Sequence, residues 1–176
     1  MTFRVQAIYA GLVCLQFALT ANSFADDFAK PDVHGVAKLS EKTENGKTLQ
    51  VRITLRDANK TDRDEARVQA GDSIGNDWWG APNDGPPDHI ISTFEVRIGK
   101  EFIPLFRSAY SDLGDVRDVR LATSKAGFVI TVYGGDTGSA YTARLRFQDG
   151  YLIERDVTSN EMGMLEKTEY FPVHDN

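Results

Sequence analysis

Cysteine is almost absent from this chain of 176 residues, since Cys14 is the only one. One cysteine forms neither an intrachain disulfide nor a multi-thiolate metal site, so stability has to come from a buried apolar core. Histidine is also scarce: His34, His89 and His174 are the only three, and none belongs to a His-x-x-x-His pair, which would place two imidazoles beside one metal ion. We therefore expect no cofactor and no metal site, although a zinc site assembled from distant segments stays open.

Blocks of basic residues are missing as well. The 20 lysines and arginines are scattered among 26 acidic residues, and the formal net charge is −6 at pH 7. Proteins that bind nucleic acid usually carry a cluster of positive charge, because acidic surfaces repel phosphates. The sequence therefore disfavours nucleic acid as a partner, and solubility explains the acidic excess.

The chain also lacks an apolar run of the roughly 20 residues that span a bilayer. The apolar stretch at residues 10–19 is interrupted by Gln16, and it lies between a positive residue, Arg4, and a small-residue ending at residues 23–25. This order is typical of a secretory signal peptide. We predict a signal peptide over residues 1–25, and hence a periplasmic or secreted protein with no membrane span after cleavage.

Cleavage before Asp26 would remove one basic residue and no acidic one, so the net charge would change from −6 to −7. Cys14 follows a short apolar stretch, as a lipoprotein cysteine does, but Val13 stands where a small residue is expected. We therefore favour cleavage over lipidation, which leaves a mature chain without cysteine.

The remaining residues, 26–176, suit a single domain. Residues 48–56 alternate between apolar and polar side chains, which is typical of a half-buried strand. Asn45-Gly46 directly before them predicts a type I′ hairpin turn, with positive φ at both residues, and pairs this strand with one near residues 33–39.

A second hairpin follows the same rules. Residues 94–98 alternate, Gly99-Lys100 turns the chain, and residues 102–106 form the return strand. Pro104 lies within that return strand, and it predicts an edge position because proline donates no hydrogen bond to a neighbour.

The C-terminal half predicts an antiparallel meander after a polar loop at residues 108–115. Glycine-containing turns separate its strands. We expect these strands at residues 119–122, 128–133, 141–147, 151–157 and 164–171. Residues 128–133 are apolar on both faces, which predicts a central strand covered on both sides. The expected fold is all-β, with about seven to nine mostly antiparallel strands forming a sandwich or a partly open barrel.

One long irregular excursion, residues 58–88, separates the two hairpins and is rich in Asp, Asn, Gly and Pro. Its only helical signal is at residues 62–69, with Thr61 as the N-cap. Loops of this length are usually functional or disordered. Oxygen ligands for calcium are present, but their spacing does not match an EF-hand and the same residues suit solvated turns. These candidate ligands are Asp72, Asn76, Asp77, Asp84 and Asp88.

Both tryptophans of the chain, Trp78 and Trp79, lie in this excursion. Tryptophan offers a large apolar area with one N–H donor, so adjacent tryptophans in a loop stack on sugar rings or anchor a protein partner. The alternative is that they fold back and plug the open end of the β-structure.

Three short patterns resemble catalytic or binding motifs, and each lacks a required part. Asp136-Thr137-Gly138 spells the aspartic-protease signature, but no second copy and no apolar pair directly before the aspartate accompany it. The surrounding glycines lack the lysine and the following helix of a phosphate-binding loop, so we interpret them as a tight hairpin turn. His89 follows Asp88, with Ser92 nearby, but neighbouring strand residues point to opposite faces and no nucleophile elbow is present.

Four segments of the C-terminal half together resemble a pattern found in a group of uncharacterised exported bacterial proteins. They are residues 108–113, 134–136, 139–143 and 166–170. The resemblance covers about residues 90 to 171 and leaves the tryptophan-containing excursion outside. It implies bacterial export and no particular activity.

Polar and aromatic residues of this half are candidates for a shared cleft. They are Tyr110, Asp112, Asp136, Tyr141, Arg144 and Arg155. The structural alternative is that Tyr141 belongs to the inward-facing set of its strand and that the two aspartates suit turns. Arg155 falls in an apolar register, which places it near the end of the sheet or beside a carboxylate.

The leading hypothesis for function is an exported, non-catalytic binding or interaction module whose partner is a protein or glycan of the cell envelope. Trp78, Trp79, Tyr110, Asp112, Asp136, Tyr141 and Arg155 are its candidate binding residues. An alternative is a hydrolase that uses Asp112 and Asp136 as paired carboxylates, which requires them to share a cleft. A structural protein of the envelope is the third alternative.

Overall fold

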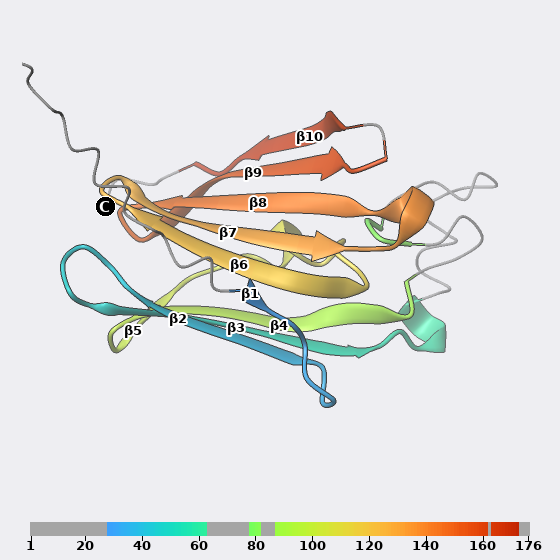
Figure 1. The fold of residues 1–176 in the computed structure, drawn as a ribbon, viewed down its shortest axis with the longest axis horizontal. Helices are drawn as coiled ribbons and strands as arrows, with labels where there is room; N and C mark the ends of the chain where they lie inside the picture. Colours follow the sequence, from blue (N-terminus) through green and yellow to red (C-terminus); the bar gives the residue numbers. More distant parts are fainter. Residues whose placement is uncertain (1–27, 63–77, 82–86, 162, 173–176) are drawn as a thin grey trace, which may run out of the picture.

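The computed structural model describes residues 28–62, 78–81, 87–161 and 163–172, which form two antiparallel β-sheets packed together (Figure 1). The six-stranded sheet has the order β1-β6-β7-β8-β9-β10, and the four-stranded sheet has the order β2-β3-β4-β5. The strands are β1 (Phe28–Ala29), β2 (Val36–Lys42), β3 (Thr48–Asp57), β4 (His89–Ile98), β5 (Glu101–Ile103), β6 (Val116–Ser124), β7 (Gly127–Gly134), β8 (Tyr141–Gln148), β9 (Tyr151–Ser159) and β10 (Met164–Tyr170). The all-β prediction is confirmed, and of the two predicted arrangements the structure has the sandwich, since neither sheet closes into a barrel. The predicted signal peptide, residues 1–25, lies outside the described residues.

The four-stranded sheet contains the two predicted hairpins. Val51 of β3 lies between Leu39 of β2 and Val96 of β4, and all three side chains are buried. Neighbouring positions along each strand point to the opposite face, which is solvent-exposed and polar. The edge strand β5 ends at Ile103, directly before Pro104, so the proline terminates the strand rather than lying inside it.

The turn between β2 and β3 differs from the prediction. Gly46 has a φ of 73°, but Asn45 does not share the positive φ that a type I′ turn requires. The Gly46 N–H donates to the Thr43 carbonyl oxygen at 2.8 Å within a longer connection. A two-residue turn with positive φ at both residues occurs instead between β8 and β9, where Asp149 and Gly150 have φ angles of 50° and 82°.

The six-stranded sheet confirms the meander, because β6 to β10 are each paired with the next strand along the chain. The predicted strand at residues 128–133 is an interior strand, β7. The predicted cover on both sides is wrong, because the second sheet packs on the inner face only: on the outer face Thr131 is 9 % exposed, but Val129 and Tyr133 are only half-buried. Thr123 of β6 donates to Glu41 of β2 at 3.0 Å, which joins the two sheets at one side. The core between the sheets includes Leu49, Ile53, Val119, Ile130, Val132, Leu145, Phe147 and Val157.

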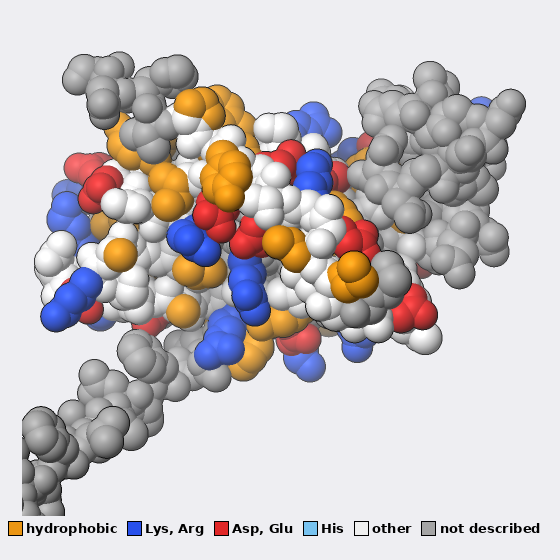
Figure 2. Space-filling view, turned by 90° about the horizontal axis from the view of Figure 1, so that it is seen from above, with side chains coloured by type: hydrophobic (Ala, Val, Ile, Leu, Met, Phe, Trp, Pro, Cys, Tyr) orange, Lys and Arg blue, Asp and Glu red, His pale blue; other side chains and the backbone are white. Residues whose placement is uncertain are grey.

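β10 forms one outer edge of the six-stranded sheet and is mostly exposed, with Glu169 the exception. Met164, Leu165 and Tyr170 are among its exposed side chains. Figure 2, which looks onto this side of the molecule, shows hydrophobic side chains lying between acidic and basic ones. This edge therefore combines apolar and charged groups in one strip.

The excursion at residues 58–88 is described only at its two ends and at residues 78–81, so the candidate calcium ligands Asp72, Asn76, Asp77 and Asp84 lie outside the described residues. Residues 60–62 are helical, and their N-cap is Asn59 rather than Thr61. The Asn59 side chain accepts a hydrogen bond from the backbone N–H of Asp62 at 3.1 Å, and the Asp62 carboxylate accepts one from the backbone N–H of Asn59 at 2.8 Å. The rest of the predicted helix, residues 63–69, lies outside the described residues.

Among the described residues, no helix has both the length and the apolar character that crossing a bilayer demands.

Candidate functional site

Trp79 is built into one end of the sandwich. Its backbone N–H donates to the Asp112 carbonyl oxygen at 2.7 Å, and its own carbonyl accepts from the Gly114 N–H at 2.8 Å. These two bonds form a short parallel bridge to Leu113, and the Trp79 side chain packs against the core. Trp78 is half-buried and lines a small hollow together with Ser139 and other residues. Of the two interpretations of the tryptophan pair, the packing of Trp79 corresponds to the plug.

Tyr141 lies fully buried at the centre of this end and explains why glycines surround it. Its hydroxyl donates to the Gly114 carbonyl oxygen at 3.0 Å. A Cβ at Gly134 would overlap the Tyr141 ring, and one at Gly80 would lie 2.9 Å from its Cε1 atom. Burial raises the pKa of the Tyr141 phenol well above its ordinary value, and the nearby Asp112 carboxylate adds to the shift. Tyr141 is therefore a neutral, closely packed side chain.

Arg155 is also fully buried, and it is neutralised by two carboxylates. Its Nη2 lies 2.6 Å from Oδ1 of Asp112, and its Nη1 lies 2.5 Å from Oε2 of Glu169. Lys167 completes the group, with its Nζ at 3.0 Å from Oε1 of Glu169. Burial opposes the charge on Glu169, but hydrogen bonds from Lys167 and Arg155 outweigh it and hold the pKa of that carboxyl below its ordinary value. Two cations and two carboxylates thus balance, which explains how a charged residue occupies an apolar register.

The other candidate residues of this half do not join Asp112, Tyr141 and Arg155. The Tyr110 ring packs against Phe94, with centroids 5.7 Å apart. Asp136 is exposed and caps the 3-10 turn Thr137–Ser139. Asp112 pairs with Arg155, so the two aspartates that a hydrolase would require have different partners. Arg144 is exposed on the outer face of β8.

The histidines do not assemble a catalytic triad or a metal site in the described part of the chain. Nδ1 of His89 lies 3.4 Å from Asp115 and its Nε2 lies 3.5 Å from Asp57. The Ser92 hydroxyl donates instead to the Thr54 carbonyl oxygen at 2.9 Å, so the Asp88-His89-Ser92 arrangement does not form. No group of three or more His, Cys, Asp or Glu residues among those described is placed to hold a metal ion.

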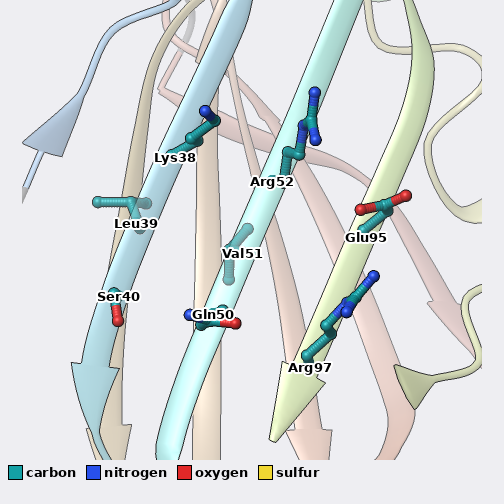
Figure 3. Close-up of a pocket in the computed structure, with 8 residues that line it drawn as sticks. All are labelled: Lys38, Leu39, Ser40, Gln50, Val51, Arg52, Glu95 and Arg97. Carbon is teal, nitrogen blue, oxygen red and sulfur yellow. The ribbon is translucent and has the colours of Figure 1, made fainter. Parts of the chain in front are cut away.

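A groove on the outer face of the four-stranded sheet was not predicted from the sequence. It has a volume of about 460 Å³ and crosses β2, β3 and β4. Its polar lining consists of Lys38 and Ser40 from β2, Gln50 and Arg52 from β3, and Glu95 and Arg97 from β4 (Figure 3). We refer to these six residues as the outer-face groove.

Strand register explains why these six side chains meet. Arg52 lies between Lys38 and Glu95 in one row across the sheet. The neighbouring row, two residues further along each strand, consists of Ser40, Gln50 and Arg97. Residues two apart point to the same face, so the two rows form one continuous polar surface.

The outer-face groove carries unbalanced positive charge. Lys38, Arg52 and Arg97 provide three cations against the single carboxylate of Glu95, and no described residue forms an ion pair with any of the three. Arg97 lies instead over the ring of Phe102 in β5, with its guanidinium carbon 3.6 Å from the ring centroid. The Phe102 side chain is 59 % exposed, which extends the groove with an aromatic surface.

Three other arginines of the chain are paired with carboxylates. Arg56 binds the Asp62 carboxylate through two hydrogen bonds of 2.6 and 2.8 Å. Arg146 pairs with Glu154, and Arg155 with Asp112 and Glu169. The cations of the outer-face groove form no such ion pair with a described residue, and they lie together on adjacent strands.

Comparison with known protein families, with curated proteins and with solved structures gives no match, so the chemistry of the chain has to be inferred from its own geometry.

Proposed function

We propose that the protein is an exported, non-catalytic binding module that holds an acidic polysaccharide of the cell envelope in the outer-face groove. The observation that carries the proposal is the set of three cations, Lys38, Arg52 and Arg97, which project from adjacent strands and form no ion pair with a described residue. Export rests on the signal-peptide pattern of residues 1–25.

The chemistry of the groove fits a chain of acidic sugars. A guanidinium presents a planar fork of donors that matches a carboxylate or a sulfate, and Arg52 and Arg97 provide two such forks. Ser40 and Gln50 lie in the same groove and both donate and accept hydrogen bonds, as sugar hydroxyls require. The exposed ring of Phe102 offers an apolar face for a pyranose ring beside Arg97.

The side-chain composition of the site also favours a polysaccharide over a protein. Protein interfaces concentrate their binding energy in buried aromatic and arginine anchors, whereas charge is depleted at their centre. The outer-face groove lacks a buried aromatic anchor: charged and amide side chains lie in its middle, and one exposed aromatic ring lies at its border. Distant acidic residues do not oppose binding strongly, because charges separated by more than about 8 Å are largely screened at physiological ionic strength.

Affinity electrophoresis tests this proposal. The protein, recovered from the envelope fraction or medium of cells that express the full chain, is run through gels containing polygalacturonate or dextran sulfate, with neutral dextran as the reference. We expect retardation by at least one acidic polymer and none by dextran. The double variant Arg52→Gln, Arg97→Gln should migrate without retardation, because both guanidinium forks are removed.

The matched control is Arg144→Gln, Arg146→Gln, which removes the same charge from the outer face of β8 in the other sheet. It should be retarded like the wild-type protein. If neither acidic polymer retards the wild-type protein, or if both double variants lose retardation equally, the outer-face groove is not the binding site. Binding of an acidic protein in the outer-face groove, without retardation by either acidic polymer, would contradict the polysaccharide assignment.

A further inference from the structure

We propose that β10 is a self-association edge, and that two copies of the chain pair through it about a two-fold axis at Thr168. The proposal is independent of the ligand of the outer-face groove, because β10 lies at the edge of the other sheet. It rests on three observations: an unpaired edge with exposed apolar residues, the direction of its free backbone groups, and a charge pattern complementary to itself.

The first observation is the character of the edge. β10 has seven residues, whereas the opposite edge of the same sheet, β1, has two and the edge strand β5 has three. The outer side of β10 is paired with no strand among the described residues. Met164, Leu165 and Tyr170 are 59 %, 58 % and 76 % exposed. The other long edge strand, β2, contributes no exposed large hydrophobic residue, so of the two long edges only β10 exposes large apolar side chains.

The second observation fixes which backbone groups are free. The Phe171 N–H donates to the Ile153 carbonyl oxygen at 3.0 Å, so Phe171 points its backbone groups toward β9. In an antiparallel ladder these directions alternate along the strand. Lys167 and Glu169 therefore also bond to β9, whereas the N–H and C=O of Thr168 and Tyr170 point outward. A second strand can pair with β10 only where its own outward-pointing N–H and C=O groups lie opposite those of β10.

The third observation selects the register. A two-fold pairing centred on Thr168 places Lys167 opposite Glu169 of the second copy, and Glu169 opposite the second copy's Lys167. Centring on Lys167, on Glu169 or on Glu166 would instead place identical charges directly opposite each other, which is destabilising. The Thr168 register also places outward-pointing groups opposite each other.

Charge balance supports the same arrangement. Asp112, Arg155, Lys167 and Glu169 form a group with two positive and two negative charges in each copy. Pairing at Thr168 brings two neutral groups together and adds two Lys–Glu contacts across the axis. It also places Leu165, which is exposed in the single chain, opposite Phe171 of the second copy. The edge thus uses its charges to specify one partner, whereas charges on an edge often serve to prevent pairing.

Sedimentation equilibrium and a cysteine cross-link test the proposal. The exported wild-type protein should show a concentration-dependent dimer. Thr168→Pro removes the outward N–H and no backbone bond to β9, and the one bond to β9 that it does remove is the exposed side-chain hydrogen bond from Thr168 to Asp156 at 2.8 Å. It should therefore abolish the dimer while leaving the protein folded by circular dichroism. The matched control, Ser40→Pro, places proline at an outward-facing position of the other long edge, β2, and should leave the dimer intact.

The cysteine cross-link tests directly which residues of the two β10 strands lie opposite each other. Residues paired at the two-fold axis lie about 5.5 Å apart between Cα atoms, a separation that a disulfide spans. Thr168→Cys should therefore form a disulfide-linked dimer under mild oxidation, whereas Glu166→Cys on the same strand should not. The wild-type protein shows any cross-linking through Cys14. A monomer at every concentration, a dimer that survives Thr168→Pro, or equal cross-linking of both cysteine variants would overturn the proposal.

Discussion

Replacing Asp112 by alanine tests how the protein tolerates a buried arginine. Arg155 is completely buried and has two carboxylate partners, Asp112 at 2.6 Å and Glu169 at 2.5 Å. Breaking a buried ion pair by removing one partner costs about 3–5 kcal/mol, because a buried charge is left without compensation. Glu169 remains after the substitution, so the expected loss lies at the lower end, about 3 kcal/mol. For a chain of this length, such a loss lowers Tm by about 6–12 °C.

The assay is thermal unfolding followed by circular dichroism, with urea unfolding as a second measure. The matched control is Glu154→Ala, which removes the partner of Arg146 at 3.1 Å. The Arg146 side chain is 55 % exposed, so this pair should be worth at most about 1 kcal/mol, or about 4 °C.

The second arm removes the buried charge itself. Arg155→Met in the Asp112→Ala background should recover part of the lost stability, because an apolar side chain of similar length needs no carboxylate. Glu169 keeps Lys167 as a partner in that variant. If Asp112→Ala lowers Tm no more than Glu154→Ala does, the argument from buried charge is wrong.

Two further predictions concern acid stability and close packing. The pKa of Glu169 is held below its ordinary value, so its stabilising contribution is present above the unfolded-state pKa of about 4.3 and is lost as the pH falls through the lower folded-state pKa. Unfolding free energy measured against pH should therefore fall less steeply in acid for Glu169→Gln, and an unchanged slope would contradict the assignment. Gly80→Ala should destabilise the protein by more than Gly99→Ala, although both glycines have positive φ, because a Cβ at Gly80 would lie 2.6 Å from the Gly114 carbonyl oxygen while one at Gly99 meets nothing within 4 Å. Urea midpoints compare the two, with about 1–2 kcal/mol expected for the conformational penalty alone, and equal midpoints would show that the contact does not matter.

The strands could be predicted from sequence because the signals that define them are local. Alternation in residues 48–56 and in the meander segments reports directly which side chains face the core. The interior position predicted for residues 128–133 is confirmed for the same reason, whereas the predicted cover on both faces is not, because only one face packs against the second sheet. Details of turns and caps were less predictable, as Asn45 and the Asn59 cap illustrate, because several neighbouring residues compete for one local role.

The candidate sites depend on contacts between distant residues, which local sequence patterns do not predict. The sequence allowed that Arg155 would lie beside a carboxylate, but Asp112 lies 43 residues away and no local pattern connects them. Lys38, Arg52 and Arg97 each appear in the sequence as an ordinary polar residue of an alternating strand. Only the register of β2, β3 and β4 places them together in one groove.

The sequence by itself determined the strand content, the order of the hairpins and the need for a core without disulfides, because period-two patterning, glycine turns and cysteine counts are properties of the chain alone. The tertiary structure decided that two open sheets pack together, that Trp79 joins the sandwich beside Leu113, and that the unbalanced cations form one groove. These features depend on contacts between residues far apart in the chain, and pairing register fixes which side chains become neighbours.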